Sequence, residues 1–270
     1  MKKITELLLS VGAADAAAIS ISECKIINPR LLSRLGFEPQ SVIMGIMPYY
    51  TAHCDGERIV SAYAVAPDYH LALKELAEKF LEGAQKLCPD SRFALYGDHS
   101  PIAEVDAAAR AGLGIIGKHG LLITPKYSSF VFLFGVFSDI PIAPTHREVQ
   151  YCEECGACVR ACPTRLKHGG ECLSSITQKK GALTVEEEAL MRKYGTAWGC
   201  DICQNVCPHT AKAKKAGTLY TDSKWFNSHP LPMPDKSITD IDDFSERAYS
   251  WRGRDVFLRN LSLFEKHEKN

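Results

Sequence analysis

The sequence lacks an excess of charge of either sign. Its 270 residues include 32 Lys and Arg against 32 Asp and Glu, so the formal net charge at pH 7 is zero. Proteins that bind nucleic acid through bulk electrostatics are usually basic. Any contact with nucleic acid must therefore depend on local patches, for which Lys212, Lys214, Lys215 and the pair Arg252 and Arg254 are candidates. Solvated surface charge explains the same side chains equally well.

Long hydrophobic runs are also missing. No stretch is long and apolar enough to span a bilayer, so we expect no membrane partner. The charged and then apolar start of the chain could be taken for a secretion signal, but Glu6 and Asp15 interrupt the apolar run. No twin-arginine pair lies near the start. We therefore expect a cytoplasmic protein, in which cysteines rarely form disulfides and more often hold metal.

Eleven cysteines stand out against this ordinary composition, and they divide the chain. Cys24, Cys54 and Cys88 are scattered, and the other eight lie between Cys152 and Cys207. We interpret the scattered three as buried or incidental thiols. The 150 residues before the cysteine region have the mix of helices and strands of an α/β domain.

Hydrophobic spacing predicts the elements of this first region. The predicted helices are 4–18, 68–87 and 102–111, and the predicted strands are 41–47, 93–96, 121–124 and 130–137. Gly112 should cap the third helix. Residues 140–148 are predicted to be a connector, 184–194 a helix with Thr184 as N-cap, 220–235 irregular and 241–266 helical.

The first cysteine run is C-E-E-C-G-A-C-V-R-A-C-P, residues 152–163. This is C-x2-C-x2-C-x3-C-P, the spacing of bacterial ferredoxins. Three cysteines at intervals of three residues can surround one face of a 4Fe-4S cube, and the fourth is carried by a helical turn toward a neighbouring cube. The run therefore predicts two clusters with interleaved ligands.

The second run, C-D-I-C-Q-N-V-C-P, lacks one cysteine of the full pattern, which Cys172 can supply. We assign Cys152, Cys155, Cys158 and the distant Cys207 to the first cluster. We assign Cys200, Cys203, Cys172 and the distant Cys162 to the second cluster. Zinc is the first alternative, but structural zinc sites usually pair two short C-x2-C knuckles. Three closely spaced cysteines followed by Cys-Pro fit zinc poorly. A disulfide framework is the second alternative, which the expected cytoplasmic location disfavours.

Two clusters alone need only a short chain, so the long first region implies a substrate or a second cofactor that receives the electrons. Its most informative segment is residues 96–120, where a strand leads to Asp98 and a helix is followed by a glycine-rich loop. Repeated glycines allow the backbone to approach a bulky ligand closely. The segment G-L-G-I-I-G follows a helix, not a strand, so it is not a dinucleotide fingerprint.

At this point the residues resemble a known family, the epoxyqueuosine reductases, which are cobalamin-dependent iron–sulfur enzymes of tRNA modification. Residues 96–120 carry the resemblance. Further stretches agree in order along most of the chain: M-P-Y-Y at 47–50, Y-A-V-A-P-D-Y-H at 63–70, K-Y-S-S-F-V-F-L at 126–133, C-L-S-S-I-T-Q-K-K-G at 172–181, W-G-C-D-I-C-Q-N-V-C-P-H at 198–209 and R-G-R-D-V-F-L-R-N-L at 252–261.

The resemblance implies an α+β fold: a nitroreductase-like α/β domain that holds base-off cobalamin, followed by a ferredoxin-like domain with two clusters. We expect residues 1–145 to bind cobalamin and substrate, 146–219 to hold the clusters, and 220–270 to pack back on the core. Electrons would pass from the clusters to cobalt, and the epoxide of the modified wobble base in tRNA would be reduced.

The resemblance also implies site residues. Asp98 is expected to be the proton donor, although a turn or N-cap role is the simpler alternative. The expected cofactor-binding residues are Tyr63, Asp68, Tyr69, His70, Asp98, Gly112, Gly114, Gly117, Lys118, Ser128, Ser129, Gln178 and Lys180. For several of these, helix capping, turn formation or solvated surface charge are plain alternatives.

The chain departs from the family at a few places. Full-length members usually carry a C-terminal helical-repeat extension that helps to hold tRNA, whereas this sequence stops at Asn270, so we expect a short form. Ile115 and His119 replace a usual tryptophan and asparagine. We expect a monomer that takes electrons from a flavodoxin- or ferredoxin-type donor, with tRNA as its partner. The alternatives are a reductase of the same family with another substrate, or a cobalamin-free electron-transfer protein.

Overall fold

The computed structural model describes residues 1–164, 172–235, 237 and 242–264. The chain divides into two compact units, which we describe separately. The first unit contains residues 1–48 and 72–155, and the second unit contains residues 49–71 and 156–270. The functional division expected at residues 145 and 219 stays a prediction.

A four-stranded antiparallel sheet forms the centre of the first unit. Its strand order is β1 (Asp15–Ser20), β2 (Ser41–Pro48), β6 (Val131–Ser138) and β3 (Phe93–Gly97). The short strands β4 (Ile115–Ile116) and β5 (Leu122–Ile123) form a separate two-stranded sheet. The four strands predicted from hydrophobic runs are therefore present.

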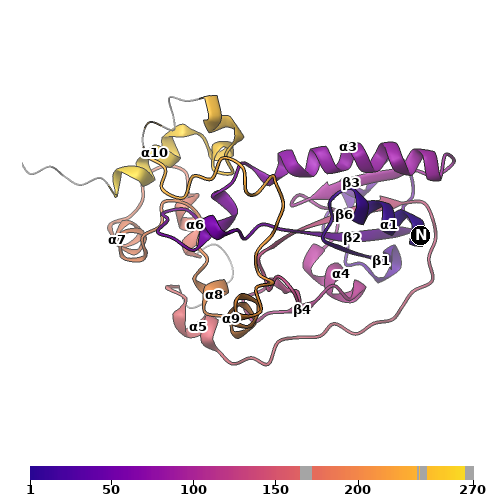
Figure 1. Ribbon diagram of the computed structural model, residues 1–270, viewed down its shortest axis with the longest axis horizontal. Coiled ribbons are helices and arrows are strands. Elements are labelled where there is room, and N and C mark those ends of the chain that lie inside the picture. Colours follow the sequence, from indigo (N-terminus) through magenta and orange to yellow (C-terminus); the bar gives the residue numbers. More distant parts are fainter. Residues whose placement is uncertain (165–171, 236, 238–241, 265–270) are drawn as a thin grey trace, which may run out of the picture. The chain divides into compact units, whose positions relative to one another are not determined.

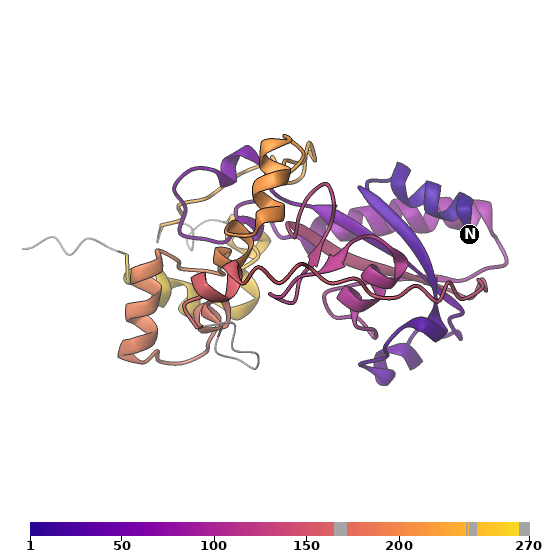
Figure 2. The ribbon, with the colours of Figure 1, turned by 90° about the horizontal axis from the view of Figure 1, so that it is seen from below.

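Helices cover both faces of the four-stranded sheet. Successive strand residues point to opposite faces, and alternate residues of β2 share a core with α4 (Glu104–Ala111). The helices α1 (Lys2–Ser10) and α3 (Tyr69–Leu87) lie over the other face, as Figures 1 and 2 show. The result is the three-layered α/β arrangement expected for this region.

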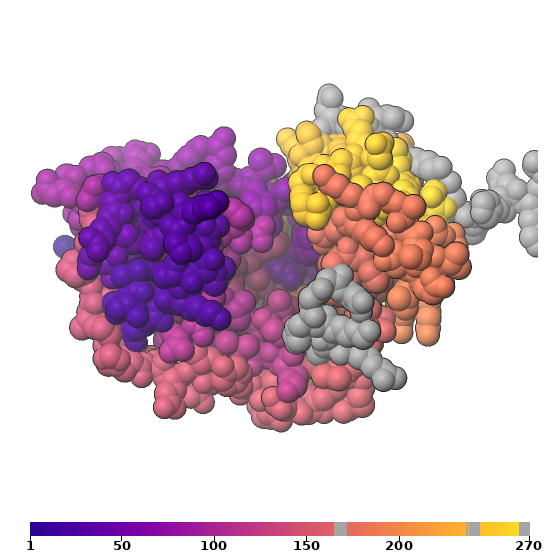
Figure 3. Space-filling model, turned by 180° about the vertical axis from the view of Figure 1, so that it is seen from behind, coloured from indigo at the N-terminus to yellow at the C-terminus, as the bar shows by residue number. Residues whose placement is uncertain are grey.

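The predicted helix over residues 4–18 is wrong. The helix α1 ends at Ser10, and Gly12 then adopts a φ of +128° that breaks the helical path. Residues Asp15–Ser20 pair antiparallel with β2, so tertiary pairing overrides the helix propensity of the alanines. The short helix α1 buries Ile4 and Leu8 and leaves its charged residues exposed. Figure 3 shows the N-terminal part of the chain, in indigo, at the surface.

The helices predicted over residues 68–87, 102–111 and 184–194 are confirmed with small shifts. The helix α4 ends at Gly112, which has the left-handed conformation of a C-cap. The helix α7 (Val185–Tyr194) begins with a capping box, because the Thr184 side chain accepts the Glu187 N–H and the Glu187 carboxylate accepts the Thr184 N–H. The short helix α2 (Pro29–Ser33) was not predicted.

Short helices make up most of the second unit. They are α5 (Ala157–Ala161), α6 (Leu173–Thr177), α7, α8 (Ile202–Asn205), α9 (Pro208–Lys215) and α10 (Arg254–Ser262). The 3-10 turns among the described residues of both units are Ile21–Glu23, Ala52–Cys54, Ala62–Ala64, Asp242–Glu246 and Ser250–Arg252. No helix in the described ranges is both long and apolar enough to cross a membrane.

An aromatic core holds the C-terminal part of the second unit. Tyr249 stacks on Phe257 with 3.8 Å between ring centroids, and Trp198 packs edge-on against both rings. The buried Asn260 amide donates to the carbonyl oxygens of Thr177 and Ala197 at 2.6 and 2.7 Å. These contacts attach α10 to the segments that carry the second cysteine run.

The single helix predicted over 241–266 is wrong in extent. Two 3-10 turns precede α10, and Gly253 with a φ of +95° separates them from it. The helical spacing of the sequence continues through Gly253, but its extended backbone with positive φ interrupts the hydrogen-bond ladder. Residues 241, 265 and 266 of that prediction lie outside the described residues.

Candidate functional site

Four thiols gather in the second unit. Cys162 follows α5, Cys172 precedes α6, Cys200 lies two residues before α8 and Cys203 lies within it. The helices α5 and α8 pack together, so turns from both cysteine runs are neighbours. These four are the cysteines that the sequence assigns to the second cluster.

The same thiols interact electrostatically. Burial, followed by the charges of Cys200 and Cys172, raises the pKa of Cys203 to about 12, and Cys162 contributes in the same direction. Burial likewise raises the pKa of Cys200 to about 11, with contributions from Cys172 and Cys162. Positive charge nearby favours the thiolate form, and bound iron would supply that charge. The donor set therefore fits an iron–sulfur cluster.

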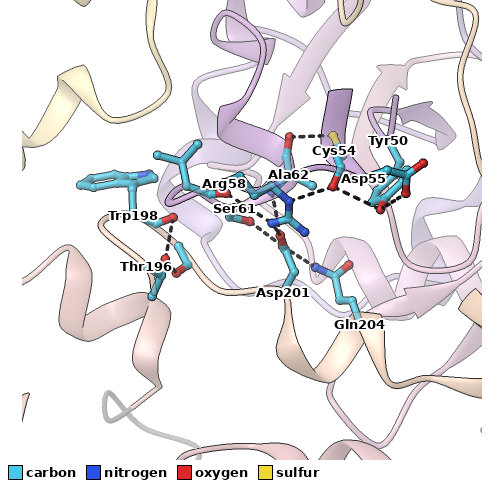
Figure 4. Close-up of polar contacts among 12 residues, drawn as sticks. Tyr50, Cys54, Asp55, Arg58, Ser61, Ala62, Thr196, Trp198, Asp201 and Gln204 are labelled. Atoms are coloured by element: carbon cyan, nitrogen blue, oxygen red, sulfur yellow. Dashed lines mark hydrogen bonds and ion pairs between the residues drawn. The ribbon is translucent and has the colours of Figure 1, made fainter. Parts of the chain in front are cut away.

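Asp201, between Cys200 and Cys203, is a buried carboxylate whose side chain is 1% exposed. Its Oδ2 accepts hydrogen bonds from Arg58 Nη1 at 2.8 Å and from the Ala62 N–H at 2.7 Å. Its Oδ1 accepts from the Ser61 hydroxyl and from Gln204 Nε2. Figure 4 shows how the loop that carries Arg58 and Ser61 surrounds this carboxylate.

A pocket of about 100 Å³ opens beside this network. Arg58, Ser61, Cys200, Asp201 and Asn205 are among the residues that line it. Cys200, which the sequence assigns to the second cluster, and the half-buried Arg58 therefore line one pocket.

The four cysteines assigned to the first cluster are divided between the two units. Cys152 and Cys155 belong to the first unit. Cys158 and Cys207 are buried in the second unit, at α5 and at the start of α9. Their assignment to one cluster stays a prediction.

Lys118 contacts the first of these cysteines through its backbone. The Lys118 N–H donates to Cys152 Sγ at 3.2 Å, and the Cys152 N–H donates to the Ile116 carbonyl at 3.0 Å. The Lys118 ammonium pairs with the exposed Glu154 at 3.0 Å. Hydrogen bonds to ligand sulfurs influence cluster potentials. The sequence predicted a cofactor or tRNA contact for Lys118, and this backbone contact to a cysteine was not foreseen.

Asp98 follows β3 in the first unit, with a φ of +63° that is uncommon for a non-glycine residue. Its side chain is exposed. The strand β3 is half-buried, not buried as its apolar sequence indicated, because it lies at the sheet edge. Such backbone conformations cluster at functional sites, and Asp98 stays the predicted proton donor.

Glu104, the first residue of α4, is a second carboxyl beside Asp98 that our sequence analysis did not single out. Burial and then the charge of Asp98 raise the pKa of Glu104 to about 8, although the Asp98 N–H donates to its carboxylate and acts in the opposite direction. Its Oε1 is buried without a hydrogen-bond partner among the described residues. At neutral pH, Glu104 is therefore mostly protonated and contacts the turn that carries Asp98.

The protonated state of Glu104 predicts a pH dependence of stability. The unfolded chain releases this proton near pH 4.5 and the folded chain near pH 8, so the free energy of unfolding should fall as pH rises between those values, by up to about 1.4 kcal/mol per pH unit. Glu104→Gln resembles the protonated form and should remove this slope. Urea unfolding at pH 5, 6, 7 and 8 measures it, and equal slopes in both proteins would contradict the assignment.

Contacts within the chain limit which residues can replace the glycines of the glycine-rich loop. A Cβ on Gly112 would overlap the Arg147 side chain, and one on Gly114 would lie 2.4 Å from the Ile123 carbonyl oxygen. A Cβ on Gly117 would lie 2.5 Å from the His119 ring. The backbone contact accounts for Gly114, and the φ of +92° accounts for Gly112. The overlaps at Gly112 and Gly117 are with side chains that can move, and the cofactor contacts of all three glycines stay predictions.

The remaining predicted cofactor residues fall into both units. In the second unit, the Asp68 carboxylate accepts the His70 N–H and contacts His70 Nδ1 at 2.8 Å, and the Tyr69 and His70 rings lie 4.1 Å apart. Asp68 thus contributes a capping contact at the start of α3. Tyr63 lies against Gly199.

Ser128 and Ser129 are buried in a turn of the first unit. Ser128 has a φ of +51°, and its carbonyl accepts the Thr124 N–H at 2.8 Å. Gln178 Nε2 donates to Ser174 Oγ at the end of α6, and Lys180 is exposed. Turn formation thus describes the two serines, while the cofactor contacts expected for all four residues stay predictions.

Comparison with known proteins places the chain in a family. A family model described as "4Fe-4S double cluster binding domain" matches residues 151–210. The epoxyqueuosine reductase of Listeria monocytogenes is 33% identical over 96% of this chain and 72% of its own length. The chain belongs to the epoxyqueuosine reductase family. The reductase of Cellulophaga algicola, 31% identical over 81% of this chain and 72% of its own length, agrees.

Solved structures of epoxyqueuosine reductases share the fold. The Streptococcus thermophilus enzyme matches 97% of this chain and 80% of its own length with a TM-score of 0.76 at 22% identity. A crystal structure of an epoxyqueuosine reductase with an epoxyqueuosine-modified tRNA stem loop matches with a TM-score of 0.77 at 23% identity over the same shares. The predicted family and the α+β fold class are confirmed.

Family membership also confirms an oxidoreductase with two 4Fe-4S clusters and cobalamin as cofactors. The four thiols assigned to the second cluster fit an iron–sulfur cluster. For cobalamin, the expected contacts stay predictions, and so does the role of the exposed Asp98 as proton donor. Cys24 and Cys54, outside the cluster assignments, are buried thiols as predicted.

Proposed function

We propose that this chain reduces epoxyqueuosine to queuosine in tRNA. The observation that carries the proposal is the 33% identity with an epoxyqueuosine reductase over 96% of the chain. Two electrons and two protons convert the epoxide into a carbon–carbon double bond and release its oxygen as water. Cobalamin, when bound, supplies a metal centre of low potential at which this reduction occurs.

The protein's own residues supply electrons and a proton. The eight cysteines hold the two clusters in the interleaved assignment given above, in residues 146–219. Asp98, in the domain at 1–145, donates a proton to the epoxide oxygen. Glu104 holds the Asp98 turn by accepting its N–H, and being uncharged it adds no negative charge beside the donor.

The expected cofactor contacts remain part of this proposal. They are Tyr63, Asp68, Tyr69, His70, Gly112, Gly114, Gly117, Lys118, Ser128, Ser129, Gln178 and Lys180. We propose a cytoplasmic monomer that receives single electrons from a flavodoxin- or ferredoxin-type protein. We also propose that the described part of residues 220–270 packs back on the core.

The sequence offers five basic residues for contact with tRNA, and three of them already interact with other side chains of the chain. Lys214 pairs with Asp55, and the guanidinium groups of Arg252 and Arg254 lie over Trp251 and Phe244. Lys212 and Lys215 lie in the last turn of α9. We therefore place phosphate contact at Lys212 and Lys215 first.

Complementation tests the proposed reaction. In a strain lacking its own epoxyqueuosine reductase, this gene should restore queuosine and remove epoxyqueuosine, as measured by mass spectrometry of tRNA nucleosides. An empty vector provides the baseline. Persistent epoxyqueuosine, although the expressed protein carries its clusters and cobalamin, would assign the chain to a different substrate.

A further inference from the structure

A buried ion pair lies beside the second cluster's ligands. Arg58 Nη1 and Asp201 Oδ2 are 2.8 Å apart, and their side chains are 14% and 1% exposed. Asp201 is the chain neighbour of Cys200, and its charge acts on the thiols of both Cys200 and Cys203. Arg58 and Cys200 line the same pocket. Both charges are therefore close to the second cluster.

Anchoring the loop does not by itself explain this pair. The Ser61 N–H donates to the Trp198 carbonyl at 2.7 Å, and the Ala197 N–H donates to the Ile59 carbonyl at 2.6 Å. This backbone pairing already joins the loop to the cysteine run. A buried carboxylate paired with a half-buried guanidinium carries a desolvation cost that neutral side chains would avoid. The charges themselves therefore call for an explanation.

Charge beside a cluster changes its reduction potential. Reduction adds one negative charge to a 4Fe-4S cluster, and net charge, hydrogen bonds and exposure set its potential. Asp201 opposes the added electron and Arg58 favours it, so the pair balances the local field. We propose that the Arg58–Asp201 ion pair sets the reduction potential of the second cluster. The inference rests on the ligands assigned to that cluster, not on the substrate.

Opposite signs in the single variants provide the test. An anaerobic redox titration of the full-length holoprotein, followed by EPR, gives the potential of each cluster without any RNA. Arg58→Met should lower the midpoint potential of the second cluster by about 59 mV for one electron. At the wild-type midpoint, the ratio of reduced to oxidised cluster then falls about tenfold. Asp201→Asn should raise the ratio by a similar factor. The double variant should return close to wild type, because both charges are gone.

Three further variants serve as controls. Cys203→Ser removes the second cluster and so identifies its signal in the titration. Arg58→Lys keeps the positive charge and should keep the potential. Arg192→Met breaks an exposed arginine pair with Glu188 in the same unit, where screening is strong, and should leave both potentials unchanged.

Iron content separates a tuning role from a structural one. Shifts of the same sign in Arg58→Met and Asp201→Asn, or unchanged potentials in both, would overturn the proposal. Loss of about half the iron in both single variants would also overturn it, because the pair would then hold the ligand loop together. If only Arg58→Met loses iron, the potential of the second cluster in Asp201→Asn tests the proposal alone. A higher potential supports the proposal, and a lower or unchanged potential overturns it. Complementation by the wild-type gene tests the proposed reaction, whereas the redox titration tests the role of the ion pair. Either proposal can therefore fail without the other.

Discussion

Cys203→Ser should purify with about half the iron of the wild-type protein and should not reduce its substrate. Cys203 is one of four thiols that interact within the second unit, and removing one ligand of a cube prevents its stable assembly. The remaining iron belongs to the first cluster, whose assigned ligands are untouched. Iron analysis and EPR of anaerobically purified protein measure both effects.

The interleaved ligand assignment predicts which cluster each cysteine variant should lose. Cys162 belongs to the first cysteine run, yet it lies near Cys200 and Cys203 in space. Cys162→Ser should therefore lose the same EPR signal as Cys203→Ser, and Cys158→Ser should lose the other. Cys88→Ser, outside both assignments, should keep all its iron. A spectrum of Cys162→Ser that matches Cys158→Ser would refute interleaving.

Asp98→Asn should lower the turnover number by a factor of about 10² to 10⁴, the usual contribution of a general acid. Asparagine has nearly the same shape and also tolerates the left-handed conformation that Asp98 adopts. The variant should therefore keep its clusters, its cobalamin and its thermal stability. Single-turnover conversion of epoxyqueuosine-containing tRNA, with chemically reduced protein, measures the loss.

A matched acid in the same unit provides the control for Asp98. Asp106 lies in the first turn of α4 and pairs with Arg110 at 2.8 Å. Asp106→Asn removes a carboxylate in the same way but should keep the wild-type rate. If Asp98→Asn retained more than about a tenth of the wild-type activity, Asp98 would not be the proton donor.

Local sequence patterns predicted the metal chemistry well because ligand spacing is itself a local constraint. Four cysteines that are separated along the chain interact in the second unit: Cys162, Cys172, Cys200 and Cys203. Counting the thiols that two cubes need was sufficient to group these four. The strand at residues 41–47 was equally clear, since every residue of β2 is buried.

Features that depend on tertiary pairing could not be predicted in this way. Asp15–Ser20 is rich in alanine and becomes a strand only because β2 lies beside it. Glu104 has the sequence signal of an ordinary helix start, and its raised pKa depends on the fold around it. Arg58 and Asp201 are 143 residues apart, so no spacing rule would have joined them.

Metal and cofactor analysis of the full-length protein, purified without oxygen, tests the central claim most directly. The account predicts four iron atoms and four sulfides for each of two clusters, and one cobalamin per chain after incubation with the cofactor. Colourless protein without iron, zinc in place of iron, or iron-loaded protein unable to take up cobalamin would contradict it.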